Sequence, residues 1–153
     1  MQTFLPHADF KQTAKDLDQK RLGKQRVEAW QILNAIQRKK EGQTKGAWLE
    51  HPCIKIWFDH EISLIEYGMD ICREWISRGF KDTMLQRFQD EMLRYKDKGF
   101  DNSKPGIIGK ACFHISHQSN LVRKLPTHYQ DLYPTVCDNI PYYWGFELKS
   151  KKQ

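Results

Sequence analysis

Apolar residues recur with a helical period in the stretch from Leu17 to Lys39. The period is about 3.6 residues, so these apolar residues share one side of the helix that they predict. They are Leu22, Ala29, Ile32, Leu33 and Ile36. Asp9 is placed to cap a turn that leads into this helix. The pattern predicts a long helix with one face against a core and the opposite face in solvent.

A second apolar pattern runs from Ile54 to Arg78 at steps of three and four residues, and it is apolar on two faces. Pro52 suits the first turn of a helix, and Gly79 suits the position just after the end of one. We therefore predict one continuous, buried central helix from Ile54 to Arg78, crossed by the helix that contains Leu22.

The rest of the chain predicts two further helices and then an irregular segment. Helical spacing predicts a third helix over Lys81–Lys98, ending at Gly99, and a less regular fourth helix over Ile107–Leu125. From Pro126 onward the chain is rich in proline and aromatic residues without a helical period, which predicts extended or turn-like structure. We expect an all-α, compact fold forming a single domain over residues 1–153, with an irregular aromatic C-terminal segment.

The charge balance adds a class of partner to this picture. The 25 Lys and Arg residues exceed the 19 Asp and Glu residues, which gives a formal net charge of +6 and an isoelectric point near 9.1. This balance favours a polyanionic partner, and nucleic acid is the first candidate. No apolar run reaches the roughly 18 residues of a membrane span, and the start of the chain does not resemble a secretion signal. We expect a cytoplasmic protein associated with nucleoid or viral DNA and no membrane partner.

The cysteines indicate neither a disulfide framework nor a metal site. They are Cys53, Cys72, Cys112 and Cys137. No two of them form a C-x-x-C pair, so we expect reduced thiols. Cys112, His114 and His117 have a spacing that a metal could use, but a fourth ligand is missing, and we expect no metal and no cofactor.

A polar stripe borders the apolar face of the first long helix and contains the main catalytic candidate. Its residues are Asp18, Arg21, Gln25 and Glu28. A carboxylate at such a border is partly desolvated and held rigidly, so Glu28 is the candidate. The alternative is a surface glutamate paired with Lys24 or Gln25. The density of cations around Glu28 favours the catalytic interpretation; these are Lys20, Arg21, Lys24 and Arg26.

Two other features have both a functional and a structural interpretation. Residues 114–124, HISHQSNLVRK, concentrate polar donors, namely His117, Gln118, Asn120, Arg123 and Lys124. These side chains either bind phosphates or base edges, or form a solvated face. Gly23, inside the first helix, either admits DNA or a neighbouring backbone at close range or marks a mild kink.

Four motifs together resemble a known family, and their order and spacing agree with it over most of the chain. They are Leu17-Asp18-x-x-x-Leu22 followed by Glu28, His51-Pro52, Trp75-Ile-Ser-Arg-Gly79-Phe80 followed by Asp82-Thr83, and Pro126-Thr127-x-Tyr129. The chain resembles the small helical pyrimidine-dimer DNA glycosylase/AP lyases of the phage endonuclease V type. Its start, MQTFLP, is similar to that of a subgroup of uncharacterised bacterial and viral relatives.

The resemblance implies a mechanism based on a terminal amine. In the phage enzymes the α-amine of a small second residue attacks the sugar after Met1 is removed, whereas Gln2 is too large for ordinary removal of Met1. The resemblance therefore implies that the nucleophile is the Met1 amine and that Glu28 is the essential glutamate. An unperturbed terminal amine has a pKa of roughly 7.7 to 8, so part of it is neutral near pH 7. Val27 replaces the arginine that precedes the glutamate, and Lys20 replaces a histidine that contacts the dimer. Both departures bear on lesion recognition more than on lyase chemistry.

The resemblance also implies a partner, double-stranded DNA carrying a damaged or modified base, bound by a monomer. The residues expected to bind DNA are Lys20, Arg21, Lys24, Gln25, Arg26, His117, Asn120, Arg123, Lys124, His128 and Tyr129. Aromatic residues from Tyr129 to Trp144 either support an unstacked nucleotide or pack in the core. Two alternatives remain at this point, a non-catalytic nucleic-acid-binding module and a structural protein of the same fold.

Overall fold

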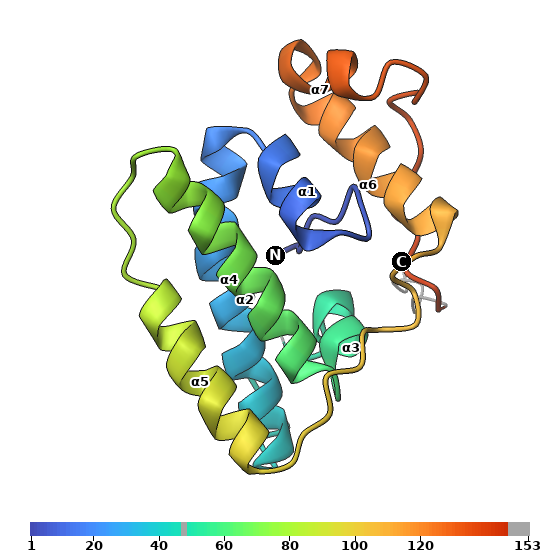
Figure 1. The fold of residues 1–153 in the computed structure, drawn as a ribbon. Coiled ribbons are helices and arrows are strands. Elements are labelled where there is room, and N and C mark those ends of the chain that lie inside the picture. The colour runs from blue at the N-terminus through green and yellow to red at the C-terminus, as the bar shows by residue number, and fades with distance from the viewer. Residues whose placement is uncertain (47–48, 147–153) are drawn as a thin grey trace.

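Helices make up most of residues 1–46 and 49–146, the part of the chain that the computed structural model describes (Figure 1). They are α1 Phe10–Asp16, α2 Gln19–Lys40, α3 Pro52–Trp57, α4 Glu61–Ser77, α5 Leu85–Asp97, α6 Ala111–Lys124 and α7 Pro126–Leu132. These described residues contain no β-strand, which confirms the all-α prediction. Within the same residues, no helix is both long enough and apolar enough to cross a membrane.

Helices α1, α2, α4 and α5 form one layer, in which α4 packs against each of the other three (Figure 1). The five residues of the apolar stripe predicted for α2 are fully buried, as predicted. Asp9 caps α1, because its carboxylate accepts hydrogen bonds from the backbone N–H groups of Lys11 and Gln12 at 2.8 and 3.1 Å. Arg78 closes the other end of α1 by donating to the carbonyl oxygen of Leu17 at 2.8 Å. Asp9 and Arg78 thus fix the two ends of α1.

Two glycines allow the helices of this layer to approach closely. A Cβ atom on Gly68 of α4 would lie 2.5 Å from the ring of Phe88 on α5. A Cβ atom on Gly23 of α2 would lie 2.9 Å from the ring of Trp75 on α4. The space beside Gly23 is therefore filled by a side chain of the same chain, and neither DNA nor another backbone segment occupies it.

The prediction of one central helix from Ile54 to Arg78 is wrong. The chain breaks between α3 and α4, where Asp59 has a positive φ of 67°. Aspartate tolerates this left-handed conformation better than most residues, and its carboxylate receives an ion pair from Lys40 at 2.9 Å. Both helices turn apolar residues toward the same core, so the spacing of three and four continues across the break. Gly79, with φ of 93°, ends α4 as predicted.

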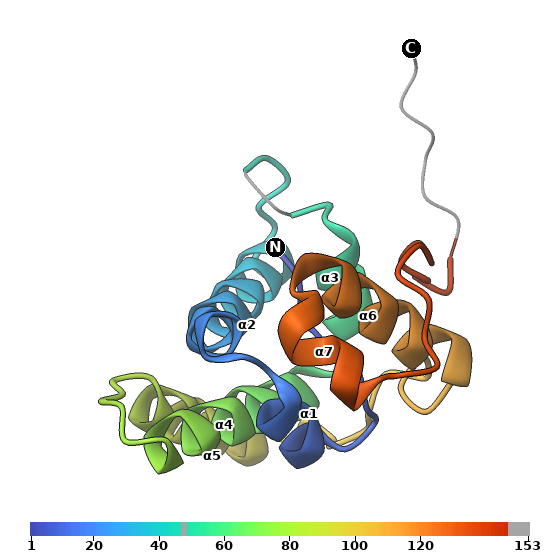
Figure 2. The same cartoon turned by 90° about the horizontal axis from the view of Figure 1, so that it is seen from above.

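Helices α6 and α7 form a second layer beside the first (Figure 2). The prediction of purely extended or turn-like structure after Pro126 is wrong for α7, whose first residue is Pro126. Proline is favoured in the first turn of a helix, and Tyr129 buries its side chain one turn later. Helix α6 is shorter than predicted and begins at Ala111. The chain from Tyr133 to Phe146 is irregular, as expected.

Candidate active site

The N-terminal segment, residues 1–6, has no regular secondary structure and lies between α2 and α6 (Figures 1 and 2). Four of its six residues, Thr3 to Pro6, are buried. Buried backbone N–H and C=O groups need hydrogen-bond partners, and this segment has no helix or strand to supply them. Side chains of the flanking helices supply them instead.

On the α2 side, a single glutamine satisfies two residues of the N-terminal segment. Gln25 Oε1 accepts from the backbone N–H of Phe4 at 3.0 Å, and Gln25 Nε2 donates to the carbonyl oxygen of Gln2 at 2.9 Å. The same Nε2 donates to Glu28 Oε2 at 2.8 Å. The hydroxyl of Tyr67 on α4 lies 2.8 Å from both Gln25 Oε1 and the carbonyl oxygen of Phe4. Gln25 therefore joins the N-terminal segment, α2 and α4.

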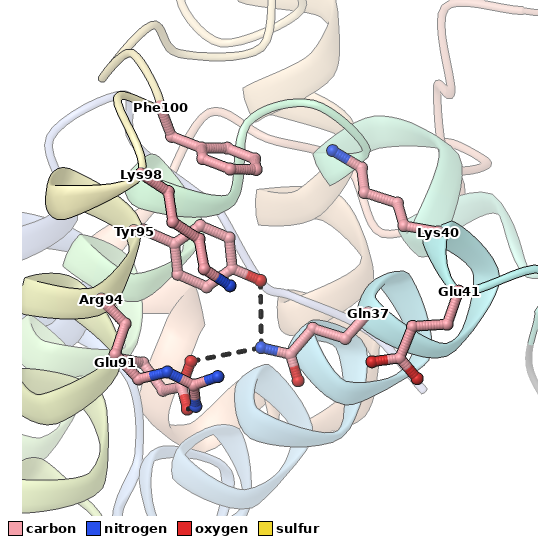
Figure 3. A pocket seen from close by; sticks show the side chains of 8 residues that line it. All are labelled: Gln37, Lys40, Glu41, Glu91, Arg94, Tyr95, Lys98 and Phe100. Atoms are coloured by element: carbon pink, nitrogen blue, oxygen red, sulfur yellow. Dashed lines mark hydrogen bonds and ion pairs between the residues drawn. The ribbon is translucent and has the colours of Figure 1, made fainter.

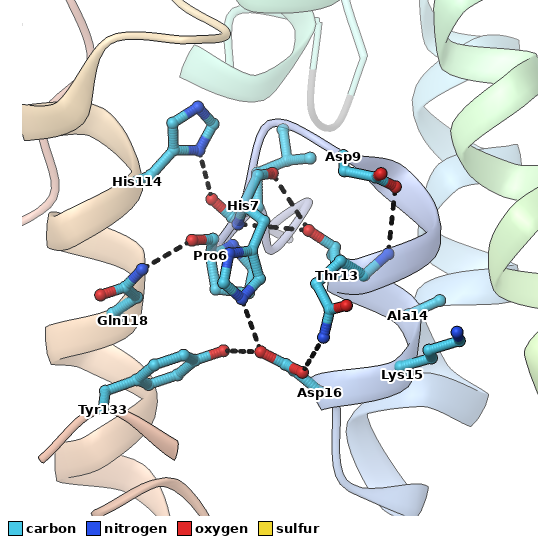
Figure 4. Close-up of polar contacts among 12 residues, drawn as sticks. Pro6, His7, Asp9, Thr13, Ala14, Lys15, Asp16, His114, Gln118 and Tyr133 are labelled. Carbon is cyan, nitrogen blue, oxygen red and sulfur yellow. Dashed lines mark hydrogen bonds and ion pairs between the residues drawn. The ribbon is translucent and has the colours of Figure 1, made fainter.

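On the α6 side, two histidines one turn apart bind the backbone of Leu5. The N–H of Leu5 donates to His117 Nδ1 at 2.9 Å, while the carbonyl oxygen of Leu5 lies 2.7 Å from His114 Nδ1, which must therefore donate. Gln118 Nε2 donates to the carbonyl oxygen of Pro6 at 2.8 Å (Figure 4). Burial lowers the pKa of His117 to about 3, so this ring is neutral near pH 7. These polar residues of α6 hold the N-terminal segment and do not form a solvated face.

This arrangement brings the start of the chain to Glu28. The backbone N–H of Gln2 donates to Glu28 Oε2 at 3.3 Å, so the carboxylate lies within one residue of the α-amine of Met1. Glu28 is 8% exposed, and Lys24 Nζ lies 3.7 Å from Glu28 Oε1. The pairing with Lys24 matches the surface alternative, but the burial and the contact with the N-terminus do not. The family resemblance implied that Glu28 and the Met1 amine act together, whereas the spacing of residues along the chain did not indicate that they would meet.

His51 and Cys53, at the start of α3, also lie near the Met1 amine. His51 Nδ1 accepts from the backbone N–H of Cys53 at 3.1 Å and thereby caps this helix. Burial lowers the pKa of His51, the positive charge of the amine lowers it further, and the charge of Glu28 opposes both effects. Burial raises the pKa of Cys53 to about 12, so its thiol is not a nucleophile near pH 7. The charges of the amine and of Glu28 thus act on the same two side chains.

A cluster around Asp16 anchors the second layer to the first. Its carboxylate lies 2.6 Å from His7 Nε2 and accepts from the Tyr133 hydroxyl and from Gln12 Nε2, both at 2.8 Å (Figure 4). His128 Nε2 donates to the backbone carbonyl oxygen of Asp16 at 2.8 Å. Sequence reasoning missed this cluster, because its members are up to 117 residues apart. The cluster fixes His7, the residue that follows the N-terminal segment.

Asp18 joins the two layers next to the Asp16 cluster. As the N-cap of α2 it accepts from the backbone N–H of Arg21, and its carboxylate also contacts the Tyr129 hydroxyl and Arg21 Nη1. Burial raises the pKa of Asp18, but the hydrogen bond from Tyr129 and the charge of Arg21 outweigh burial and lower it overall. Asp18 is therefore held as a carboxylate, and its role is structural.

Five cations form a basic patch across the α2 and α6 edges of the site. They are Lys20, Arg21, Lys24, Arg123 and Lys124. Desolvation lowers the pKa of Lys124, and the nearby charges of Arg21, Arg123 and Lys24 lower it further, so α2 and α6 bring these four groups close together; Lys20 lies one helical turn before Lys24. All except Arg21 are exposed. Such a group of like charges is unfavourable by itself and is stabilised by a polyanion.

The other residues expected to bind DNA are placed differently. Gln25, His117, Asn120 and Tyr129 are at most 1% exposed and are occupied by contacts within the protein, which leaves them no surface for DNA in this conformation. Arg26 is partly buried, pairs with Asp82, and lies over the Trp75 ring at 4.5 Å. His128 is partly exposed but donates to Asp16. Residue type alone could not show which of these polar side chains are exposed to solvent and which make contacts inside the protein.

Comparison with known families shows the family to which the chain belongs. A family described as pyrimidine dimer DNA glycosylase matches residues 1–88. The chain belongs to this family. Comparisons with curated proteins and with solved structures give no match. The matched residues of this glycosylase family member contain the N-terminal segment, Glu28 and His51, whereas α6, α7 and the aromatic segment lie outside the match.

In this family member, the aromatic C-terminal segment returns to the N-terminus. Tyr142 packs its ring against His117 at a centroid distance of 5.3 Å, and its hydroxyl interacts with the side chain of Gln2. Trp144 meets the ring of His51 edge to face at 6.4 Å and that of Tyr142 at 5.7 Å. Both rings are partly buried, so part of each ring packs against the protein and part of its surface is accessible.

The candidate site contains an amine, a carboxylate and hydrogen-bonding side chains. Across residues 1–46 and 49–146, no three His, Cys, Asp or Glu side chains are grouped so that they could hold a metal ion. Cys112 is exposed, whereas the ring nitrogens of His114 bond to the backbone of Leu5 and Gly109. The C-x-H-x-x-H spacing therefore reflects the binding of the N-terminal segment.

Proposed function

We propose that this chain is a DNA glycosylase with an associated AP lyase activity, which excises a damaged or modified pyrimidine from double-stranded DNA through an imine at the Met1 α-amine. Cyclobutane dimers are one candidate lesion. The observation that carries the proposal is the hydrogen bond from the backbone N–H of Gln2 to Glu28 Oε2, because it supports a terminal amine acting beside a partly desolvated carboxylate. Membership of the pyrimidine dimer DNA glycosylase family supports it.

The proposed reaction uses only these two groups for covalent chemistry. The neutral amine of Met1 forms a bond to C1′ of the damaged nucleotide, and the glycosidic bond breaks with its electron pair leaving on the base, which takes up a proton. The nitrogen loses a proton, and the C1′–O4′ bond then breaks with its electron pair and a proton going to O4′, which gives the protonated imine. Glu28 stabilises the positive charge that develops on the sugar. It then assists removal of the C2′ proton, so that the bond from C3′ to the phosphate oxygen breaks.

The basic patch gives the proposed substrate a place to bind. Lys24 belongs to the patch and also lies 3.7 Å from Glu28, so the cations adjoin the proposed catalytic carboxylate. Lys and Arg side chains that contact phosphates fix the position of a duplex without reading its sequence. A monomer supplies all of these groups, and we propose that it acts as one.

Borohydride trapping tests the proposal directly. Untagged protein, with its N-terminal mass verified, is incubated with duplex DNA containing an abasic site and with sodium borohydride. We expect a stable protein–DNA adduct that peptide mapping assigns to the Met1 nitrogen. An adduct on Lys20 or Lys24 would leave a lyase but overturn the assignment of the amine. A folded protein that gives no adduct on abasic or dimer-containing duplexes would support the non-catalytic binding module.

A further inference from the structure

We propose that Gln25 is a positioning residue that sets the Met1 amine and Glu28 relative to each other, and this inference rests on the proposed function. Gln25 was expected to bind DNA, but its side chain is 1% exposed and turned into the protein. All four of its hydrogen-bonding positions are used. Two of them bind the backbone of the N-terminal segment, one binds Glu28 and one faces Tyr67.

The orientation of the Gln25 amide follows from its neighbours. A backbone N–H can only donate, so the group that faces Phe4 must be the oxygen Oε1. A backbone carbonyl can only accept, so the group that faces Gln2 must be the nitrogen Nε2. The same nitrogen then has one proton left, and that proton points to Glu28 Oε2. This amide therefore fits in one orientation only, with its donor side toward the carbonyl of Gln2 and toward Glu28.

A single side chain thus controls two distances that the reaction needs. Gln25 holds the carbonyl of Gln2, one residue after the amine, and also holds the carboxylate of Glu28. The segment has no strand or helix of its own, so without Gln25 its α2 side keeps only the Gln2 to Glu28 bond at 3.3 Å and the Tyr67 contact. Small displacements of reacting groups carry large rate penalties, because the reaction requires near-contact geometry.

The first experiment compares leucine substitutions at two glutamines of the same helix. Gln25→Leu removes every bond described above. Gln37→Leu is the matched control, because Gln37 Nε2 donates to Glu91 and to the Tyr95 hydroxyl at the opposite end of α2, at 3.2 and 3.0 Å (Figure 3). With saturating abasic DNA, we expect Gln25→Leu to slow borohydride trapping at least tenfold while DNA affinity stays within about twofold. Gln37→Leu should trap within about twofold of the unaltered protein.

The second experiment uses the isosteric substitution Gln25→Glu and separates positioning from simple loss of stability. The new carboxylate turns an oxygen toward the carbonyl of Gln2 and toward Glu28, where the amide had a donor. Protonation restores one O–H donor on this side. The ratio of the trapping rate of Gln25→Glu to that of the unaltered protein should therefore rise at least threefold as the pH falls from 8 to 5.5. A purely structural role of Gln25 gives a ratio that does not rise.

The outcomes distinguish this inference from the proposed function. If the unaltered protein gives no adduct, the proposed function fails, and the positioning role fails with it. If the unaltered protein traps DNA and Gln25→Leu traps equally fast, only the positioning role is overturned. If Gln25→Leu does not fold, the pH dependence of Gln25→Glu decides, and a flat ratio overturns the inference.

Discussion

The backbone N–H of Gln2 donates to Glu28 Oε2 over 3.3 Å, across 26 residues of sequence. The nitrogen that precedes Gln2 in the chain is the proposed nucleophile. Because Thr3 to Pro6 are buried between α2 and α6, the segment cannot slide without breaking its bonds to Gln25, His114 and His117. The position of the amine is therefore set by the length of chain before this anchored part.

We predict that extra residues before Met1 abolish trapping and leave DNA binding intact. A tag scar of two or three residues moves the terminal amine several ångströms from Glu28, since each extended residue adds about 3.3 Å. Borohydride trapping of abasic duplex, measured beside a binding titration, checks this. A matched protein with the same residues added after Gln153 should trap at the normal rate. Full adduct yield from the extended protein would move the nucleophile to a lysine side chain.

We predict that Glu28→Gln separates base excision from imine formation. The substitution keeps the shape of the side chain and removes its charge, so expulsion of a base loses the group that stabilises the developing positive charge. We expect excision from a dimer-containing duplex to fall at least a hundredfold, whereas a pre-formed abasic site, from which no base must leave, is still trapped. Separate assays of base release and of adduct yield measure the two steps. Equal losses in both assays would show that Glu28 acts on the amine itself.

We predict that reversing two cations of the basic patch lowers DNA affinity and its salt dependence together. Lys20→Glu with Lys124→Glu removes up to two phosphate contacts and leaves the Lys24 contact with Glu28 in place. The slope of log K against log salt should become shallower by about one to two units. Lys96→Glu, at an exposed position of α5, is the control and should leave this slope unchanged. An unaltered slope in the double variant would place the DNA-binding face elsewhere.

The spacing of apolar residues predicted a helix well where one apolar face repeats, as in α2. The prediction of one continuous helix was wrong where two successive helices, α3 and α4, share one core. Ile54 and Ile62 lie in different helices, yet both are buried in that core, so their spacing could not show the break at Asp59. The start of α7 was also missed, because Pro126 was taken as a helix breaker when it occupies the first helical turn.

The candidate site was only partly predictable from the sequence, for a physical reason. Glu28 and the exposed cations could be found because helical spacing places them on one helix edge. Gln25 and His117 could not be assigned correctly, because their partners are backbone groups 21 and 112 residues away. A polar side chain that binds an irregular buried segment has the same sequence pattern as one that faces solvent. Only the fold distinguishes them.

The stability of the fold should decrease as the pH falls from about 6.5 to 4.5, with His117 as a main cause. Burial lowers the pKa of His117 to about 3 in the folded protein, so in this range the unfolded chain takes up a proton that the folded chain does not. Each such group lowers the free energy of unfolding by up to about 1.4 kcal/mol per pH unit. Asp18 and Asp82, whose pKa values are lowered, add their losses below about pH 4 and do not obscure this range.

His117→Asn tests this assignment, because the asparagine Oδ1 takes the place of Nδ1 as the acceptor for the N–H of Leu5 and does not titrate. Urea unfolding at several pH values between 4.5 and 7 should give a slope that is shallower in His117→Asn by about 1 kcal/mol per pH unit. The pKa of His114 and of His51 is also lowered, so a residual slope should remain in the variant. Parallel curves for the two proteins would mean that His117 is protonated equally in the folded and unfolded chains. The folded ring would then be charged over much of this pH range, and a charged ring has no nitrogen that can accept the N–H of Leu5.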